Sequence, residues 1–208
     1  EEDVSIDEIE KILRQDPGLA ANVLRLANSA FFGVPSKVTS LKQAVVLLGV
    51  QRFSKIAVAA SMNQTMAAAV SGYRLSPGDL WLHSIAVSTT AEALAKNRQL
   101  DPGYDFFTPA LLHDLGKLVL GKFVKAEQSK MDGLVDNGVP VVYAEKEVLK
   151  IDHAEIGALI LNKWSFPDDL VTAVRWHHNP EGMDNPNPQV DIVYLANLMC
   201  HLNDDSNA

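Results

Sequence analysis

Apolar residues recur along this chain with the three- and four-residue spacing of amphipathic helices, and the alternating pattern of half-buried β-strands does not recur. Helix-start signals precede the first apolar segments. Residues 5–8, SIDE, have the form of a capping box and predict a helix that ends at about Gln15, and Asp16-Pro17 predicts the start of the next helix. The pattern therefore predicts an all-α protein.

The first third of the chain has the pattern of a helical bundle without catalytic motifs. Residues 28–40 are a predicted loop, because Gly, Pro and Ser are frequent there. The helix that follows is expected to break near Gly49 and to resume to about Ala69. We therefore predict an N-terminal bundle at residues 1–74 and a second helical domain at residues 75–208.

The second domain begins with a strong helix-start signal. Ser76 is a candidate cap, Pro77 takes the first helical position, and Asp79 favours the positive end of the helix dipole. Capping residues and apolar spacing predict further helices downstream. Their expected ranges are 103–121, 123–136, 141–150, 153–163, 167–178 and 189–202.

Composition and charge restrict the compartments and the partners that this helical protein can have. The chain of 208 residues is 47% hydrophobic, which is enough for a sizeable core, and its formal net charge of −8 disfavours direct binding to nucleic acid or to an anionic membrane. It has a single cysteine, Cys200, and no apolar run long enough to span a bilayer. We expect a cytoplasmic protein without membrane contact, and the start at Glu1 instead of methionine predicts a piece of a longer chain.

Five of the six histidines, all at predicted helix positions in the second domain, are candidate ligands. Imidazole and carboxylate groups together suit divalent iron, manganese, zinc or nickel. His113 and Asp114 can face one ion when neighbouring helices converge on them, and Lys117 shares their helix face, where it could neutralise a phosphate or orient a water. Asp79 and His83 share another helix face, since they are four residues apart.

Each of these residues has a simpler interpretation when it is taken alone. A single histidine in a helix is more often a hydrogen-bonded packing residue than a ligand, and an isolated His-Asp pair occurs by chance in many proteins. The whole set favours a site, because polar groups among the leucines of residues 111–118 need partners and one ion would satisfy several of them. A phosphate-loop match at residues 116–122 is discarded, since Phe123 replaces the hydroxyl residue of that motif and no strand precedes it.

The ordered set of motifs resembles a known superfamily. HDLGK at residues 113–117, with His83 before it and His153, His177 and His178 after it, is similar to the HD superfamily of metal-dependent phosphohydrolases. Residues 12–53, ILRQDPGLAANVLRLANSAFFGVPSKVTSLKQAVVLLGVQRF, resemble the N-terminal signature of the HDOD group, the HD-related output domains of bacterial signalling proteins. The resemblance implies an all-helical fold with an N-terminal bundle packed on an HD-like core, and a regulatory role downstream of a sensor or receiver module.

The resemblance also implies roles for single residues. Lys117 matches the lysine after the HD pair and would be catalytic only if the chain is an enzyme. The later histidines, His153, His177 and His178, are similar to those that hold a second ion in HD-GYP phosphodiesterases. Asp79 stands where some of those enzymes place a carboxylate. The implied cofactor is one or two divalent ions of iron, manganese, zinc or nickel. The implied ligands are Asp79, His83, His113, Asp114, His153, His177 and His178.

Two departures from the pattern favour signalling over hydrolysis. The final aspartate of the HD pattern stands here as Asn197, whose neutral amide ligates a cation less strongly than a carboxylate does. The GYP motif is missing, because the chain reads NPEGMDNP after His178. We expect a signal-transduction output module with a catalytically deficient metal site, whose partners are other signalling proteins, an upstream sensor or receiver domain, or a nucleotide ligand. The alternative is an active metal-dependent phosphohydrolase or phosphodiesterase, which the retained histidines and Lys117 favour.

Overall fold

The computed structural model describes residues 12–13, 15–32 and 37–205, so the predicted capping box lies outside the described residues. The part of the chain that is described is helical and contains no β-strand beyond one isolated bridge between Val70 and Leu75. The all-α prediction is confirmed.

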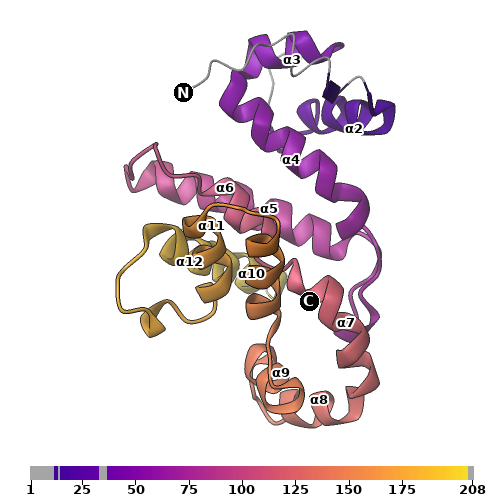
Figure 1. The fold of residues 1–208 in the computed structure, drawn as a ribbon, viewed down its shortest axis with the longest axis vertical. Helices are drawn as coiled ribbons and strands as arrows, with labels where there is room; N and C mark the ends of the chain where they lie inside the picture. Colours follow the sequence, from indigo (N-terminus) through magenta and orange to yellow (C-terminus); the bar gives the residue numbers. More distant parts are fainter. Residues whose placement is uncertain (1–11, 14, 33–36, 206–208) are drawn as a thin grey trace. The chain divides into compact units, whose positions relative to one another are not determined.

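The chain forms two compact units, Glu1–Thr65 and Met66–Ala208, and the described part of each is built from helices (Figure 1). The predicted boundary between residues 74 and 75 stays a prediction. The described helices of the first unit are α2 (Pro17–Ala27), α3 (Leu41–Leu48) and α4 (Val50–Met66).

Local signals explain the helix limits of the first unit. The Asp16 side chain caps α2 by accepting a hydrogen bond of 2.9 Å from the Leu19 N–H, and Ser40 caps α3 in the same way through Gln43. Gly49 separates α3 from α4 with φ of +76°, a conformation that glycine adopts without steric cost. The break predicted at Gly49 is therefore present.

The second unit carries the remaining helices and all six histidines. Its core combines α5, α6 and α12 around apolar residues such as Ala91, Phe106 and Val193, and a second apolar cluster forms around Leu120 and Met131. The elements are η1 (Ser71–Tyr73), α5 (Asp79–Asn97), α6 (Phe107–Leu112), α7 (Gly116–Ala126), α8 (Gln128–Val135), α9 (Val141–Leu149), α10 (His153–Lys163), α11 (Asp168–Trp176), η2 (Pro180–Gly182) and α12 (Pro188–Asp205).

The single helix predicted over residues 103–121 is wrong, because two helices meet there. α6 ends at Leu112 and α7 begins at Gly116, and the turn between them is the His-Asp motif. Gly116 lies directly against the His153 carbonyl, where any side chain would clash. This close approach brings the start of α7 onto the start of α10 and so brings the two motifs together.

The predicted break near residue 122 is also misplaced, because α7 continues to Ala126. Gly121 does not end the helix. It leaves room for the segment before α5, since Gly72 lies against the Gly121 carbonyl and Val70 lies where a side chain on Gly121 would stand. A glycine that looks like a helix stop in the sequence serves tertiary packing instead.

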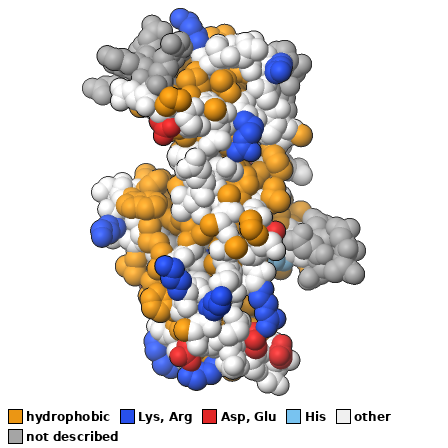
Figure 2. Space-filling model, turned by 90° about the vertical axis from the view of Figure 1, so that its right-hand side faces the viewer, with side chains coloured by type: hydrophobic (Ala, Val, Ile, Leu, Met, Phe, Trp, Pro, Cys, Tyr) orange, Lys and Arg blue, Asp and Glu red, His pale blue; other side chains and the backbone are white. Residues whose placement is uncertain are grey.

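The surface is mixed in character. Figure 2 shows hydrophobic side chains exposed in patches on one face, with Lys and Arg side chains spread among them. None of the described helices is both long enough and apolar enough to cross a bilayer.

Candidate metal centre

His113 and His177 occupy equivalent positions at two helix ends. His113 follows α6 and bonds its Nδ1 to the Ala110 carbonyl at 2.7 Å, and His177 follows α11 and bonds its Nδ1 to the Val174 carbonyl at 2.7 Å. Nδ1 must donate in each pair, because a carbonyl only accepts. Donation from Nδ1 leaves Nε2 as the nitrogen of each ring that can face a ligand, and both Nε2 atoms are buried without a hydrogen-bond partner among the described residues.

His153 is held from behind by a buried carboxylate. Glu145, on α9, accepts hydrogen bonds from the His153 backbone N–H at 2.8 Å and from His153 Nδ1 at 2.8 Å. This contact orients the ring and leaves Nε2 facing the Asp114 carboxylate, 3.2 Å from Oδ1. Sequence analysis missed Glu145; the one available signal was an acidic residue beside Ala144 on the inner face of a predicted helix.

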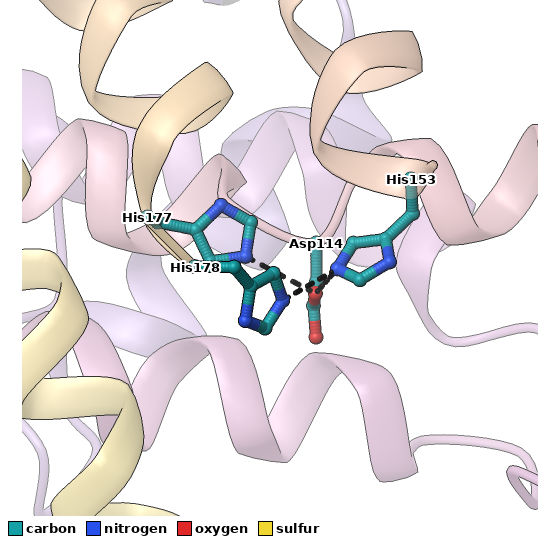
Figure 3. A group of neighbouring side chains, drawn as sticks. All are labelled: Asp114, His153, His177 and His178. Carbon is teal, nitrogen blue, oxygen red and sulfur yellow. Dashed lines mark hydrogen bonds and ion pairs between the residues drawn. The ribbon is translucent and has the colours of Figure 1, made fainter. Parts of the chain in front are cut away.

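Three histidine rings converge on Asp114 (Figure 3). His177 Nε2 lies 4.0 Å from Asp114 Oδ1, and His178 Nε2 lies 2.9 Å from His153 Nε2. Asp114 Oδ1 is itself buried without a hydrogen-bond partner among the described residues. The ligand atoms of these four side chains all lie within 4.8 Å of one another. We call Asp114, His153, His177 and His178 the first ligand group.

A second ligand group shares the same aspartate and comprises His83, His113 and Asp114. His113 Nε2 lies 3.4 Å and His83 Nε2 lies 3.9 Å from Asp114 Oδ2. The structure places Asn197, on α12, beside this group: its Oδ1 lies 3.0 Å from His83 Nε2, and its side chain is buried. An amide oxygen therefore stands next to the second group where a carboxylate would supply charge.

Lys117 and Asp79, two further predicted residues, have different surroundings. Lys117 Nζ donates a 2.7 Å hydrogen bond to Asp114 Oδ2 and lies 5.7 Å from the centre of the Tyr73 ring. Asp79 accepts a 2.6 Å hydrogen bond from the Ser76 N–H at the start of α5. The structure thus brings Lys117 to the centre and leaves Asp79 outside both ligand groups. His201, which sequence analysis did not single out, lies against His83 with ring centroids 4.7 Å apart and ring planes tilted by 33°.

Burial and charge leave most ligands in the state that binds cations. Burial lowers the pKa of His83 to about 4 and of His178 to about 3, and it holds the pKa of His177 well below the ordinary value, so these imidazoles are neutral at pH 7. Burial opposes ionisation of Asp114, yet His113 and Lys117 outweigh it and hold its pKa well below the usual range.

His153 differs from the other rings. Burial lowers its pKa, but the nearby Asp114 carboxylate and the hydrogen bond to Glu145 outweigh burial and raise the pKa above its ordinary value. A bound cation would replace that proton at Nε2 while Glu145 still accepts from Nδ1. The three orphaned atoms (His113 Nε2, His177 Nε2 and Asp114 Oδ1) are the observation that fits a metal, because one or two ions would satisfy all of them.

The fold and the centre place the chain among all-helical proteins with a buried histidine-aspartate cluster. Similarity to known proteins identifies the family. The HDOD domain family model matches residues 1–180. The chain belongs to the HDOD family. It is 24% identical over 201 residues to an uncharacterised protein of Treponema pallidum, covering 94% of this chain and 38% of that protein's length.

Solved structures agree with this assignment. An HDOD domain protein of unknown function from Geobacter sulfurreducens has a TM-score of 0.83 and 26% identity, with 97% of this chain and 68% of that chain covered. A candidate phosphohydrolase from Shewanella amazonensis has a TM-score of 0.85 and 28% identity, with 99% and 72% covered. A candidate signal transduction protein from Marinobacter aquaeolei, at 24% identity with a TM-score of 0.73 and 94% and 44% covered, shares the fold.

Proposed function

We propose that this chain is a cytoplasmic bacterial signalling output module whose HD-like core holds at least one divalent metal ion and has little or no hydrolase activity. The observation that carries the proposal is that the two ligand groups around Asp114 contain three buried ligand atoms that have no hydrogen-bond partner among the described residues. Burying such atoms without a partner costs free energy, and an ion that binds only the folded state would stabilise the fold by mass action.

The first ligand group is the better candidate for an occupied site. It offers three imidazoles and a carboxylate, the donor set that iron, manganese, zinc or nickel accepts, and Glu145 orients one of the rings. Such an ion would lower the pKa of a bound water. Lys117 would hold Asp114 Oδ2 and keep the carboxylate ionised.

The proposed role in signalling rests on family membership and on the exposed surface. The chain belongs to the HDOD family, and α12 exposes four large apolar side chains at helical spacing. A stripe of this kind supports contact with another signalling protein or with a sensor or receiver domain. The residues are Leu195, Leu198, Met199 and Leu202.

A second candidate function is metal-dependent phosphohydrolysis. The observation in its favour is that Asp114 belongs to both ligand groups, the arrangement by which one carboxylate bridges two ions. Asn197 argues against it, because the amide beside His83 adds no negative charge to the second group.

Elemental analysis of protein purified without chelator tests the proposed function. We expect about one ion per chain in the wild type, none when His113→Ala and Asp114→Ala are combined, and an unchanged ion content in the matched control Asp79→Asn. A folded double variant that keeps its ion would refute the ligand assignment. Turnover of a simple phosphodiester at about 1 s⁻¹ or faster, lost in His113→Ala, would establish the second candidate instead.

A further inference from the structure

A pocket with a volume of ≈ 100 Å³ opens beside the first ligand group. It lies between α9, the start of α10 and the end of α11, and His178 forms part of its wall. Because His178 also belongs to the first ligand group, a molecule in this pocket would adjoin an ion held there.

Two cations line the pocket, and they differ in how their charge is balanced. Lys146 Nζ lies 3.1 Å from Asp152 Oδ2 and 3.6 Å from Glu155 Oε1, so the carboxylates of the same wall neutralise it. Arg175 is half-buried and has neither an ion pair nor a hydrogen bond with any of the described residues. A partly desolvated guanidinium without a carboxylate partner is unfavourable, and its planar fork matches two oxygens of a phosphate or carboxylate.

Aromatic side chains form the rest of the wall. Trp176 is half-buried, and the η2 turn packs against its ring: a side chain on Gly182 would lie 2.8 Å from Trp176 Cζ3. Tyr143, 56% exposed, stands at the rim. A fixed indole and a nearby phenol offer flat apolar faces to a planar ring.

We propose that this pocket binds a small phosphate-bearing molecule with a planar ring, of the nucleoside monophosphate class. Arg175 binds the phosphate, Trp176 contacts the ring, and His178 connects the pocket to the metal centre. The volume is several times the roughly 10–15 Å³ that one water needs, so it admits a phosphoryl group while the rest of the ligand extends past Tyr143. The inference deepens the proposed function, because it rests on the same centre and names its ligand class.

Calorimetric titration of inorganic phosphate, AMP and adenosine into the full chain tests the pocket, with metal-loaded and metal-free protein compared. Arg175→Gln should weaken phosphate and AMP by about tenfold or more, because a charge-assisted hydrogen-bond pair is lost. Arg98→Gln, a matched change at an exposed arginine after α5, should leave both affinities unchanged. Trp176→Leu should weaken AMP and spare inorganic phosphate.

Several results would overturn the inference. They are equal AMP affinity in Arg175→Gln and the wild type, adenosine binding as tightly as AMP, or no binding of phosphate and AMP by either form of the wild type. Failure of the metal centre is separable, since it would appear as absence of the ion in elemental analysis while Arg175-dependent phosphate binding by metal-free protein persists.

Discussion

The two ligand groups share Asp114 but differ in how firmly their other members are held. The first group takes its histidines from the start of α10 and the end of α11, and Glu145 holds His153 through two hydrogen bonds, one to its backbone N–H and one to its ring Nδ1. The second group includes His83, which is only partly buried and pairs with the neutral Asn197. Because donor charge and the support behind each ligand strengthen metal binding, we expect the first group to hold an ion more tightly than the second.

Gly116→Ala should have the largest effect on the two ligand groups, because it separates the helices on which both groups depend. The new methyl group would clash with the His153 carbonyl, so the start of α7 must move away from α10. We expect a loss of about 3 kcal/mol in the free energy of unfolding, seen as a fall of about 6–12 °C in the thermal midpoint. Metal uptake should fail with it.

The matched control for this substitution is Gly133→Ala in α8. A side chain there would meet no atom within 4 Å, and alanine favours a helix, so stability should stay equal or rise slightly. Equal melting of Gly116→Ala and the wild type would mean that the contact between α7 and α10 does not assemble the centre.

Glu145→Gln should weaken metal binding by the first ligand group alone, because Glu145 supports a histidine of that group. An amide can still accept a hydrogen bond from His153 but no longer supplies charge to the ring, and loss of such a support typically weakens metal binding about 10- to 100-fold. Competition with a chelator would measure the change. Glu147→Gln, on the exposed side of the same helix, is the control. Unchanged metal affinity in Glu145→Gln would mean that the support from Glu145 does not make the first group bind an ion more tightly than the second.

Asn197→Asp should have the smallest effect and act on the second group. The substitution restores a carboxylate beside His83 with almost no change in volume. We expect the second group to bind its ion about tenfold more tightly, with the first group unaffected. A titration that resolves two binding steps would show this gain, and an unchanged second step would mean that Asn197 does not limit the site.

Much of the ligand set can be recognised from the amino-acid sequence, for identifiable reasons. Imidazole and carboxylate side chains suit divalent metals, and HDLGK with the later histidines resembles the ordered motifs of the HD superfamily, so His113, Asp114 and these histidines stand out in the sequence. Asp79 shows the limit of that reasoning: helical spacing put it on the face of His83, yet its carboxylate binds the Ser76 N–H at the helix start. A local hydrogen bond decided its place.

The amino-acid sequence by itself determined the helical class, the caps at Asp16 and Ser40, and the chemistry of the histidine set, because these follow from local hydrogen bonding and residue type. Tertiary structure decided where the long predicted helix divides, since the contact of Gly116 with His153 joins segments far apart in the chain. It also decided that Glu145 supports a ring eight residues away, and that Arg175 lines the pocket next to His178. Contacts of this kind arise only when separate helices pack, so no local pattern records them.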